Sequence, residues 1–339
     1  MKVISLFSGC GGLDLGFSNA GFQIVYANDN DKAVWETFEK NHGIKIDRRS
    51  ICDIHHEEIP EADGIIGGPP CQSWSIAGNK KGIQDFRGRL FYEYIRILLG
   101  IKPKFFLAEN VPGILTKPHF LEFKKILWAL KQIGYNISWR VVNAADYGVP
   151  QERRRVIVVG YRKDINKTFT FPAPTHSRHG GILPNGLCLP KWKTIRDAIG
   201  DLPEPLSMRE KGYANNDLII PNHEYLIDDA FKYFRSNKYR NWDKPAFTIV
   251  SDFRGLLLHP NSTPPVKLPD GTWGFNIQNP KYRYLSVREC ARIQTFPDSF
   301  IFYYKRLEDG YKMIGNAVPV KLAEALAKKI MADLNNDSQ

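Results

Sequence analysis

The sequence predicts an α/β fold in which a mostly parallel sheet is covered by helices and is joined to a second, irregular domain. Three observations favour this class. Short apolar runs alternate with amphipathic stretches through the first 170 residues, as in consecutive βα units. A glycine-rich turn follows the first apolar run and opens a helix, which is typical of nucleotide-binding sheets. From Phe171 onward the alternation gives way to a region rich in Pro, Asn, Gly and aromatic residues.

These changes in residue pattern and composition divide the 339 residues into three parts. We expect an α/β domain with the cofactor site and the chemistry over residues 1–170, and a smaller domain over 171–310. The remaining segment, 311–339, has again the residue pattern of the α/β domain. It contains a predicted helix over 320–334, whose apolar face would pack on the first domain.

Composition limits the possible functions. Hydrophobic residues make up 43% of the chain, which excludes a disordered protein, and the formal net charge is +11. That charge favours a polyanionic partner, nucleic acid before a membrane surface, although basic enzymes without such a partner are common. Five scattered cysteines without a CxxC pair argue against a metal site and a disulfide framework. No apolar run approaches membrane-spanning length, so we expect a cytoplasmic protein.

The first predicted strand, residues 2–7, leads into a turn that contains Gly9 and Gly11. Glycines let the backbone approach a ligand, and the N-terminus of the following helix offers free N–H groups. The spacing is not that of the complete GxGxxG dinucleotide fingerprint. Because glycines also serve packing, the turn by itself indicates a nucleotide-type ligand only weakly.

Acidic residues end the next two predicted strands. Strand 22–27 is followed by Asp29, where an acid commonly holds a ribose diol. Asp29 could equally cap the helix expected over 31–41. Residues 50–54 are predicted as a third short strand end, with Asp53 at its tip. Together with the glycine turn, the two acids describe a pocket for an adenosine-type ligand.

The candidate nucleophile is Cys71. The apolar strand 62–66 ends in two glycines and two prolines that immediately precede this residue. Chemistry in parallel sheets takes place beyond the carboxyl ends of strands, and the prolines stiffen the approach to the thiol. A buried structural cysteine is the usual alternative. The polar loop 77–89 that follows is either a mobile lid or a solvated surface loop.

Charged residues flank two further buried strands. Strand 104–108 ends at Glu109, which could act as a general acid with a raised pKa or could cap a loop. Arg153 and Arg155 precede strand 156–159, and their alternation would place both on one face, where they could hold a phosphate or a base carbonyl. A solvated face is the alternative. Helices over 90–99 and 120–133 and a strand over 137–142 complete this domain.

The irregular region contains a dense basic patch, residues 231–240, with four cations, no acid and interleaved aromatic residues. This composition suits contacts to phosphates and base edges. Its cations include Arg235, Lys238 and Arg240. Arg254, in a turn next to a glycine, could reach a guanine edge. Each of these side chains could instead be a solvated surface residue.

Six motifs occur in order along nearly the whole chain. They are Phe7-Ser8-Gly9-Cys10-Gly11-Gly12, Gly68-Pro69-Pro70-Cys71-Gln72, Glu109-Asn110-Val111, Gln151-x-Arg153-x-Arg155, residues 288–297, and Gly315-Asn316-Ala317-Val318-Pro319. In this order the set resembles the bacterial DNA cytosine carbon-5 methyltransferases, and the framework is most similar to members that modify GGCC. The combination of Pro-Cys-Gln, Glu-Asn-Val and Gln-x-Arg-x-Arg is highly specific for the family, whereas the glycine turn alone is not.

The resemblance implies a Rossmann-like, S-adenosylmethionine-dependent methyltransferase domain with a mixed, mostly parallel sheet, and a small target-recognition domain. It implies that Cys71 attacks carbon-6 of a cytosine flipped out of duplex DNA. Glu109 would contact ring nitrogen-3 and the exocyclic amine, and Arg155, with Arg153, would hold the base carbonyl. The implied cofactor residues are Phe7, Gly9, Gly11, Asp29, Asp53, Gly68, Leu90 and Asn316. For DNA binding the resemblance implies Thr248, which adds to the candidates that the basic patch and the turn supply, Arg235, Lys238, Arg240 and Arg254.

Two segments depart from the family pattern. Asn30 stands where an aromatic residue usually follows the acid of the second strand, so stacking on the adenine edge is lost there. Residues 248–254 differ from the corresponding segment of the GGCC enzymes, which leaves the target sequence open.

We therefore expect a monomeric, site-specific modification enzyme of a restriction–modification system or an orphan counterpart, with a cognate endonuclease as a possible partner. A transfer-RNA cytosine methyltransferase shares the motif set and is the alternative. Two other classes fit fewer of the motifs. One is a nicotinamide-dependent oxidoreductase, and the other is a catalytically silent DNA-binding module.

Overall fold

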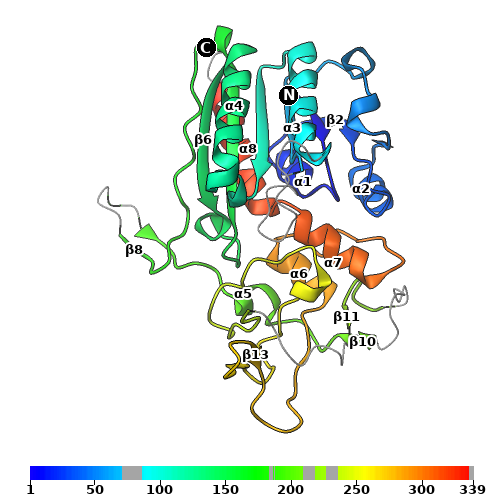
Figure 1. Cartoon of the computed structure of the whole chain (residues 1–339), viewed down its shortest axis with the longest axis vertical. Coiled ribbons are helices and arrows are strands. Elements are labelled where there is room, and N and C mark those ends of the chain that lie inside the picture. The colour runs from blue at the N-terminus through cyan, green and yellow to red at the C-terminus, as the bar shows by residue number, and fades with distance from the viewer. Residues whose placement is uncertain (71–85, 183–185, 187, 209–217, 227–235, 336–339) are drawn as a thin grey trace. The chain divides into compact units, whose positions relative to one another are not determined.

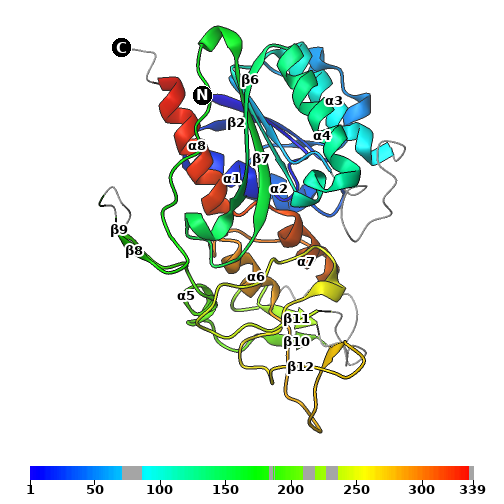
Figure 2. The ribbon, with the colours of Figure 1, turned by 60° about the vertical axis from the view of Figure 1, so that its left-hand side comes forward.

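The computed structural model of the chain describes residues 1–70, 86–182, 186, 188–208, 218–226 and 236–335. The chain forms two compact units, which can be followed by colour in Figure 1 and Figure 2. The first unit comprises Met1–Asn143, Arg154–Pro174 and Val320–Gln339, and the second comprises Ala144–Arg153 and Thr175–Pro319.

The first unit is built on a seven-stranded sheet with the order β3-β2-β1-β4-β5-β7-β6. The neighbours from β3 to β5 pair in parallel, whereas β7 runs antiparallel to both β5 and β6. This arrangement confirms the predicted mixed, mostly parallel sheet. The strands are β1 (Lys2–Leu6), β2 (Gln23–Asn28), β3 (Ile46–Asp47), β4 (Gly64–Gly67), β5 (Phe105–Asn110), β6 (Tyr135–Asn143) and β7 (Arg154–Arg162).

Helices cover both faces of this sheet because its central strands are apolar on both sides. Every residue of β5 is buried, as expected for a strand between two helical layers. Figure 2 shows α8 on one face and α3 and α4 on the other. A glycine at position 16 lets α1 pack closely on α8, since a Cβ there would lie 2.4 Å from the Cβ of Ala323. The helices of this unit are α1 (Gly12–Asn19), α2 (Trp35–His42), α3 (Phe86–Ile101), α4 (Lys117–Gln132) and α8 (Val320–Asn335).

Several boundaries differ from those predicted, and α3 and β7, for example, are longer at both ends. Residues 50–54 do not end a strand, because the chain forms the 3-10 helix η1 (Ile51–Asp53) there. The Oγ of Ser50 accepts a hydrogen bond from the N–H of Cys52 at 3.3 Å, a local contact that favours a turn over a strand. Helix α2 begins at Trp35, and Glu109 lies inside β5 rather than beyond it. The other 3-10 helices described in this unit are η2 (His56–Glu58), η4 (Pro112–Leu115) and η6 (Lys163–Ile165).

The second unit contains little regular structure, as the composition of the region predicts. Its described helices are α5 (Ile195–Ile199), α6 (Val287–Ile293) and α7 (Leu307–Asn316), with the 3-10 helices η5 (Ala144–Tyr147) and η7 (Phe253–Gly255). Its described strands pair as β8 (Gly181–Ile182) with β9 (Cys188–Leu189), β10 (Leu206–Met208) with β11 (Glu224–Leu226), and β12 (Val266–Lys267) with β13 (Trp273–Gly274).

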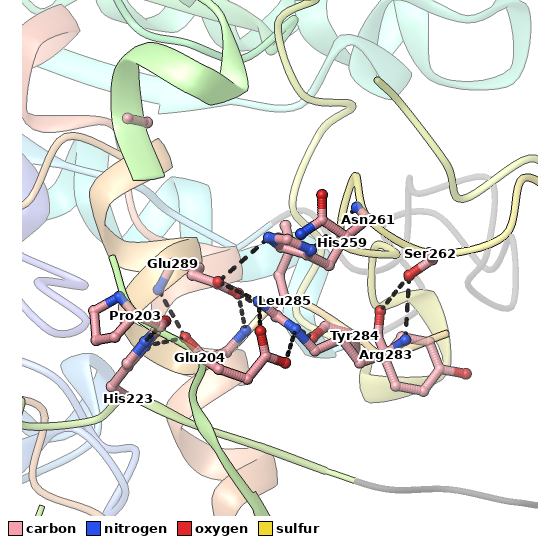
Figure 3. A network of polar contacts seen from close by, with 12 residues as sticks. Pro203, Glu204, His223, His259, Asn261, Ser262, Arg283, Tyr284, Leu285 and Glu289 are labelled. Atoms are coloured by element: carbon pink, nitrogen blue, oxygen red, sulfur yellow. Dashed lines mark hydrogen bonds and ion pairs between the residues drawn. The ribbon is translucent and has the colours of Figure 1, made fainter. Parts of the chain in front are cut away.

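A polar network around the start of α6 stabilises the second unit (Figure 3). Ser286 and Glu289 form a capping box, in which each side chain accepts a hydrogen bond from the other residue's N–H. Arg283 donates to both carboxylate oxygens of Glu289 at 2.9 Å and contacts Glu204 at 2.7 Å. Burial lowers the pKa of His259 to about 4, although Glu289 opposes this shift. The network therefore holds a neutral histidine beside a paired carboxylate.

No helix in the described ranges is both long and apolar enough to cross a membrane. Four cysteines lie in those ranges, and none of these four forms a disulfide. Cys10 and Cys290 are buried, whereas Cys52 and Cys188 are exposed. Burial raises the pKa of Cys10 to about 12, with a further contribution from Asp14. The Cys10 thiol therefore stays protonated at neutral pH and is unsuited to be a nucleophile.

Candidate active site

The residues predicted at the strand ends lie along one edge of the sheet. In the parallel register, Leu6 of β1 pairs with Asn28 of β2 and with Gly67 of β4, and Gly67 pairs with Ala108 of β5. The carboxyl ends of the four strands therefore lie at the same edge, with β5 continuing two residues further to Asn110, and parallel sheets hold their ligands at this edge. The next residues along these strands are Phe7, Asp29, Gly68 and Glu109.

The turn after β1 has an unusual backbone. Phe7 adopts a left-handed φ of 55°, which is rare for a bulky residue and typical of functional sites. Gly9 and Gly11 also have positive φ, 56° and 91°. A Cβ at Gly11 would lie 2.0 Å from Nε2 of His42, whereas a Cβ at Gly9 would meet no atom within 4 Å. The backbone at Gly9 therefore borders open space that a ligand could enter.

Asp29 is held against this turn. Its Oδ2 accepts a hydrogen bond from the N–H of Gly9 at 2.8 Å, and its Oδ1 accepts one from the N–H of Asp31 at 2.9 Å. The indole of Trp35 donates to its carbonyl oxygen at 2.8 Å. Asp29 is not the N-cap of α2, since Val34 occupies that position. A carboxylate offers about four acceptor sites, so this arrangement is compatible with further binding of a ribose diol.

Glu109 and Arg155 form a nearly buried ion pair. The antiparallel register places Ile157 of β7 opposite Glu109, so the N-terminal end of β7 lies at the same edge as the carboxyl end of β5. Nε of Arg155 contacts Oε1 of Glu109 at 2.8 Å, and the two side chains are only 10% and 11% exposed. Burial lowers the pKa of Arg155, and the pairing with Glu109 opposes that shift. The guanidinium remains charged, because its ordinary pKa is very high.

The segment before Cys71 lies beside this pair. A Cβ on Gly68 would lie 3.4 Å from Oε2 of Glu109. The side-chain amide of Asn110 donates to the carbonyl oxygen of Pro69 at 3.2 Å. These contacts hold the chain against β5 up to Pro69, two residues before the candidate nucleophile. Cys71 itself lies outside the described residues.

The remaining predicted cofactor residues have varied surroundings. Leu90 is half-buried on α3, and Asp53 is exposed on η1. Asn316 is exposed at the last position of α7, in the second unit. In the first unit, the structure thus brings Phe7, Gly9, Gly11, Asp29 and Gly68 to the edge that carries Glu109 and Arg155.

Two residues of this edge were missed by sequence reasoning. His42 packs under Gly11, and burial lowers its pKa to about 4. Nothing in the sequence around His42 indicates this contact, because it depends on how α2 packs. Asn110 orients the Pro69 carbonyl, and its place in the Glu109-Asn110-Val111 motif was the signal that could have identified it.

Arg153 has different surroundings from Arg155. It belongs to the second unit and is only 1% exposed. Its guanidinium donates to the backbone carbonyl oxygens of Ile249 at 2.8 Å, Gly315 at 2.8 Å and Ala317 at 3.0 Å. The predicted alternation treated the two arginines as one pair, whereas these contacts link Arg153 to two backbone segments of its own unit.

Two of the predicted DNA-binding residues contact Glu152 in the second unit. The guanidinium of Arg240 pairs with the Glu152 carboxylate at 2.8 Å and stacks on Phe247, with 3.9 Å between the guanidinium carbon and the ring centre. The Oγ1 of Thr248 donates to the Glu152 carbonyl oxygen at 2.8 Å. Arg240 is thus held by protein groups. Arg235 lies outside the described residues.

Arg254 and Lys238 are the other two described cations of this predicted set, and both interact with Asp252. Arg254 is 66% exposed and contacts the Asp252 carboxylate at 2.8 Å. Burial lowers the pKa of Lys238, and Asp252 opposes that shift. Arg254 is therefore the more accessible of the two to a phosphate or a base edge.

Comparison with known proteins identifies close relatives. Residues 1–332 match the family model described as C-5 cytosine-specific DNA methylase. The Type II methyltransferase M.MthTI of Methanothermobacter thermautotrophicus is 52% identical over 337 residues, which is 98% of each chain. M.FnuDI of Fusobacterium nucleatum is 50% identical over 341 residues, covering 99% of this chain and 96% of the relative. A crystal structure described as a DNA modification methyltransferase from an E. coli prophage aligns with a TM-score of 0.71 at 24% identity, covering 99% of each chain. This last likeness supports the fold.

Proposed function

Because this chain belongs to the C-5 cytosine-specific DNA methylases, we propose that it methylates one cytosine within a short duplex DNA sequence through a covalent bond to Cys71. Membership makes it an enzyme that uses S-adenosylmethionine as methyl donor. The nucleophile, the extrusion of the base and the target sequence are the parts that we propose.

The ion pair between Glu109 and Arg155 carries this proposal. It supplies a hydrogen-bond acceptor and a fixed positive charge at a strand end, in surroundings with little water, where charges interact strongly. Gly68 leaves the space next to Glu109 free of a side chain. A flat pyrimidine ring could therefore approach the carboxylate, with Cys71 three residues further along the chain.

The chemistry requires a nucleophile because carbon-5 of cytosine is unreactive by itself. The Cys71 thiolate adds to carbon-6, which turns the ring into an enamine that is nucleophilic at carbon-5. Glu109 contacts nitrogen-3 and the exocyclic amine, and Arg155 orients Glu109 and holds the base carbonyl. S-adenosylmethionine, when bound, would supply the methyl group that carbon-5 receives and would leave as S-adenosylhomocysteine. A base then removes the carbon-5 proton, the bond between sulfur and carbon-6 breaks, and the aromatic ring and the thiolate are restored.

The glycine turn fits the methyl donor. The backbone at Gly9 borders open space, and Asp29 places a carboxylate beside it, as an adenosine ribose requires. In the proposal the donor is held by Phe7, Gly9, Gly11, Asp29, Asp53, Gly68, Leu90 and Asn316.

The reacting ring cannot be reached inside a stacked duplex, so we infer that the cytosine is flipped out. Arg235, Lys238, Arg240, Thr248 and Arg254 are the proposed DNA contacts. The exposure of Arg254 supports a direct contact, whereas the ion pair of Arg240 with Glu152 supports a role in shaping the surface. A GGCC-like target is proposed from the similarity of the framework.

The relatives M.MthTI and M.FnuDI are Type II methyltransferases, which favours a role in restriction–modification. In that role a monomer in the cytoplasm would protect host DNA from an endonuclease that cuts the same sequence.

Methyl transfer from labelled S-adenosylmethionine to duplex DNA tests the proposal. Cys71→Ala should reduce transfer at least ~10³-fold, because the covalent step is lost. The matched control is Cys52→Ala, which changes an exposed thiol and should retain wild-type activity. Full activity in Cys71→Ala would overturn the mechanism. Preferential transfer to transfer RNA would favour the alternative substrate, and bisulfite sequencing of DNA from expressing cells would identify the target.

A further inference from the structure

We infer that Arg153 is a positioning residue that couples two segments of the second unit, the DNA-reading segment at residues 248–251 and the segment around Asn316 at the end of α7. Occupation of one segment by its ligand then strengthens binding at the other. The inference rests on the proposed function, which assigns Thr248 to DNA and Asn316 to the cofactor. All the contacts that carry it lie within the second unit.

The guanidinium of Arg153 joins two segments that are distant in sequence. One terminal nitrogen, Nη1, donates to the carbonyl oxygen of Ile249, the residue after Thr248. The other, Nη2, donates to the carbonyl oxygens of Gly315 and Ala317, the residues on either side of Asn316. A planar fork can satisfy three carbonyl groups in fixed directions, whereas a lysine ammonium on its flexible stem cannot hold the same geometry.

Two buried glutamines form a second connection between the same segments. Oε1 of Gln151 accepts a hydrogen bond from the N–H of Ile249 at 3.0 Å, and its Nε2 donates to Gln294 at 3.0 Å. Nε2 of Gln294 donates in turn to the carbonyl oxygen of Ile314 at 2.8 Å. We call Gln151, Arg153 and Gln294 the seam.

The two backbones also touch directly at Gly315. A Cβ on this residue would lie 2.3 Å from the carbonyl carbon of Val250 and 2.4 Å from the nitrogen of Ser251. Because Gly315 has no side chain, the backbone of residues 250 and 251 packs directly against the end of α7, and a side chain at position 315 would force the two backbones apart. Gly310 on the same helix is crowded by the ring of Tyr304 instead.

The seam therefore constrains the backbone next to both predicted contact residues. Both backbone groups of Ile249 are held, the N–H by Gln151 and the carbonyl by Arg153. Asn316 is exposed, but the carbonyl groups before and after it are bound by one nitrogen. A ligand that orders Thr248 thus orders Asn316 as well, and the second ligand then binds to a turn that is already ordered.

The test is the affinity for S-adenosylhomocysteine, which cannot react, measured by calorimetry with and without the duplex that the wild-type enzyme methylates. For the wild type we expect DNA to tighten this affinity at least tenfold. Arg153→Lys keeps the charge but loses the fork, and the tightening should fall below threefold. Gly315→Ala keeps the three side chains of the seam but pushes the two backbones apart, and it should reduce the tightening in the same way. Gly310→Ala, the control on the same helix, should keep the wild-type ratio.

The ratio of the S-adenosylhomocysteine affinities with and without duplex distinguishes a loss of coupling from a simple loss of binding. Thermal unfolding identifies variants that do not fold. If Arg153→Lys does not fold, Gly315→Ala decides the matter. The wild-type ratio in folded Arg153→Lys or folded Gly315→Ala would overturn the inference, as would an equal loss in Gly310→Ala. Methyl transfer by the wild type separates the two proposals. An inactive wild type overturns the proposed function, whereas an active wild type in which DNA leaves the cofactor affinity unchanged overturns the coupling alone.

Discussion

Asp14 illustrates how a single residue can influence the stability of the first unit. Its carboxyl group is wholly buried in the first turn of α1. Burial raises the pKa of Asp14 to about 7, with the Ser5 hydroxyl opposing the rise. Neither carboxyl oxygen forms a hydrogen bond of normal geometry to a described residue, so the charged form is poorly compensated.

We therefore expect Asp14→Asn to change the pH dependence of stability. The folded-state pKa lies above the ordinary value of 3.8, so the stabilisation from the neutral carboxyl is complete below about pH 4 and is lost as the pH rises through 7. The loss is at most about 4 kcal/mol, since one pKa unit corresponds to ~1.4 kcal/mol. Urea unfolding between pH 4 and pH 8 should show a smaller decline for Asp14→Asn than for the wild type. The control Glu61→Gln, at an exposed position, should follow the wild type, and an Asp14→Asn profile identical to it would contradict the assignment.

The site residues differ in how well the sequence predicts them. Glu109 follows an apolar run and belongs to a specific motif, so its place at a strand end was predictable. Arg153 and Arg155 are alike in the sequence, and only their neighbours distinguish them. Arg155 contacts a carboxylate, whereas Arg153 contacts three backbone carbonyl groups. These contacts depend on chain segments that are far away in the sequence.

At the level of elements, the turn between β1 and α1 separates two uses of glycine. Gly11 is required by packing, since His42 occupies the space that a Cβ would need. Gly9 has no such neighbour, and its positive φ is the only local obstacle to a side chain. The Asp29 carboxylate on the N–H of Gly9 marks the open space beside this glycine as one that a ligand could enter.

Gly9→Ala should therefore weaken S-adenosylmethionine binding at least tenfold, because its methyl group would occupy the proposed cofactor space. Its cost in stability should be only about 1 kcal/mol, from the left-handed backbone. Gly43→Ala is a matched control, because Gly43 also has a positive φ and no atom within 4 Å of a Cβ. It should cost similar stability and leave the affinity unchanged. Equal cofactor affinities in the two variants, measured by calorimetry, would argue against a ligand at Gly9.

Elements with long apolar runs were predicted well, and short ones were not. The central strands β1, β4, β5 and β7 are buried between helices, so their sequences are apolar on both faces. Strand β3 has only two residues and carries no such pattern. The segment after it was assigned to a strand, whereas the side chain of Ser50 stabilises a 3-10 turn. Local hydrogen bonds of this kind override a short apolar run.

For the molecule as a whole, the net charge of +11 is consistent with binding to a polyanion. Arg254→Ala should reduce the slope of log affinity against log salt by about 1, because one phosphate contact is lost. Arg48→Ala removes an exposed cation of the first unit that pairs with Glu39, and it should leave the slope unchanged. Fluorescence anisotropy on one duplex from 50 to 200 mM salt would measure both. A wild-type slope in Arg254→Ala would place this side chain away from the phosphates.

The sequence by itself determined the class of fold, the order of the central elements and the motif residues, because buried strands and glycine turns are encoded by neighbouring residues. The tertiary structure alone decided which of those residues meet. The antiparallel course of β7 brings Arg155 to Glu109, and the packing of α7 on residues 250 and 251 places Gly315 there without a side chain. Such contacts depend on the register of distant segments, and no local pattern in a single sequence records that register.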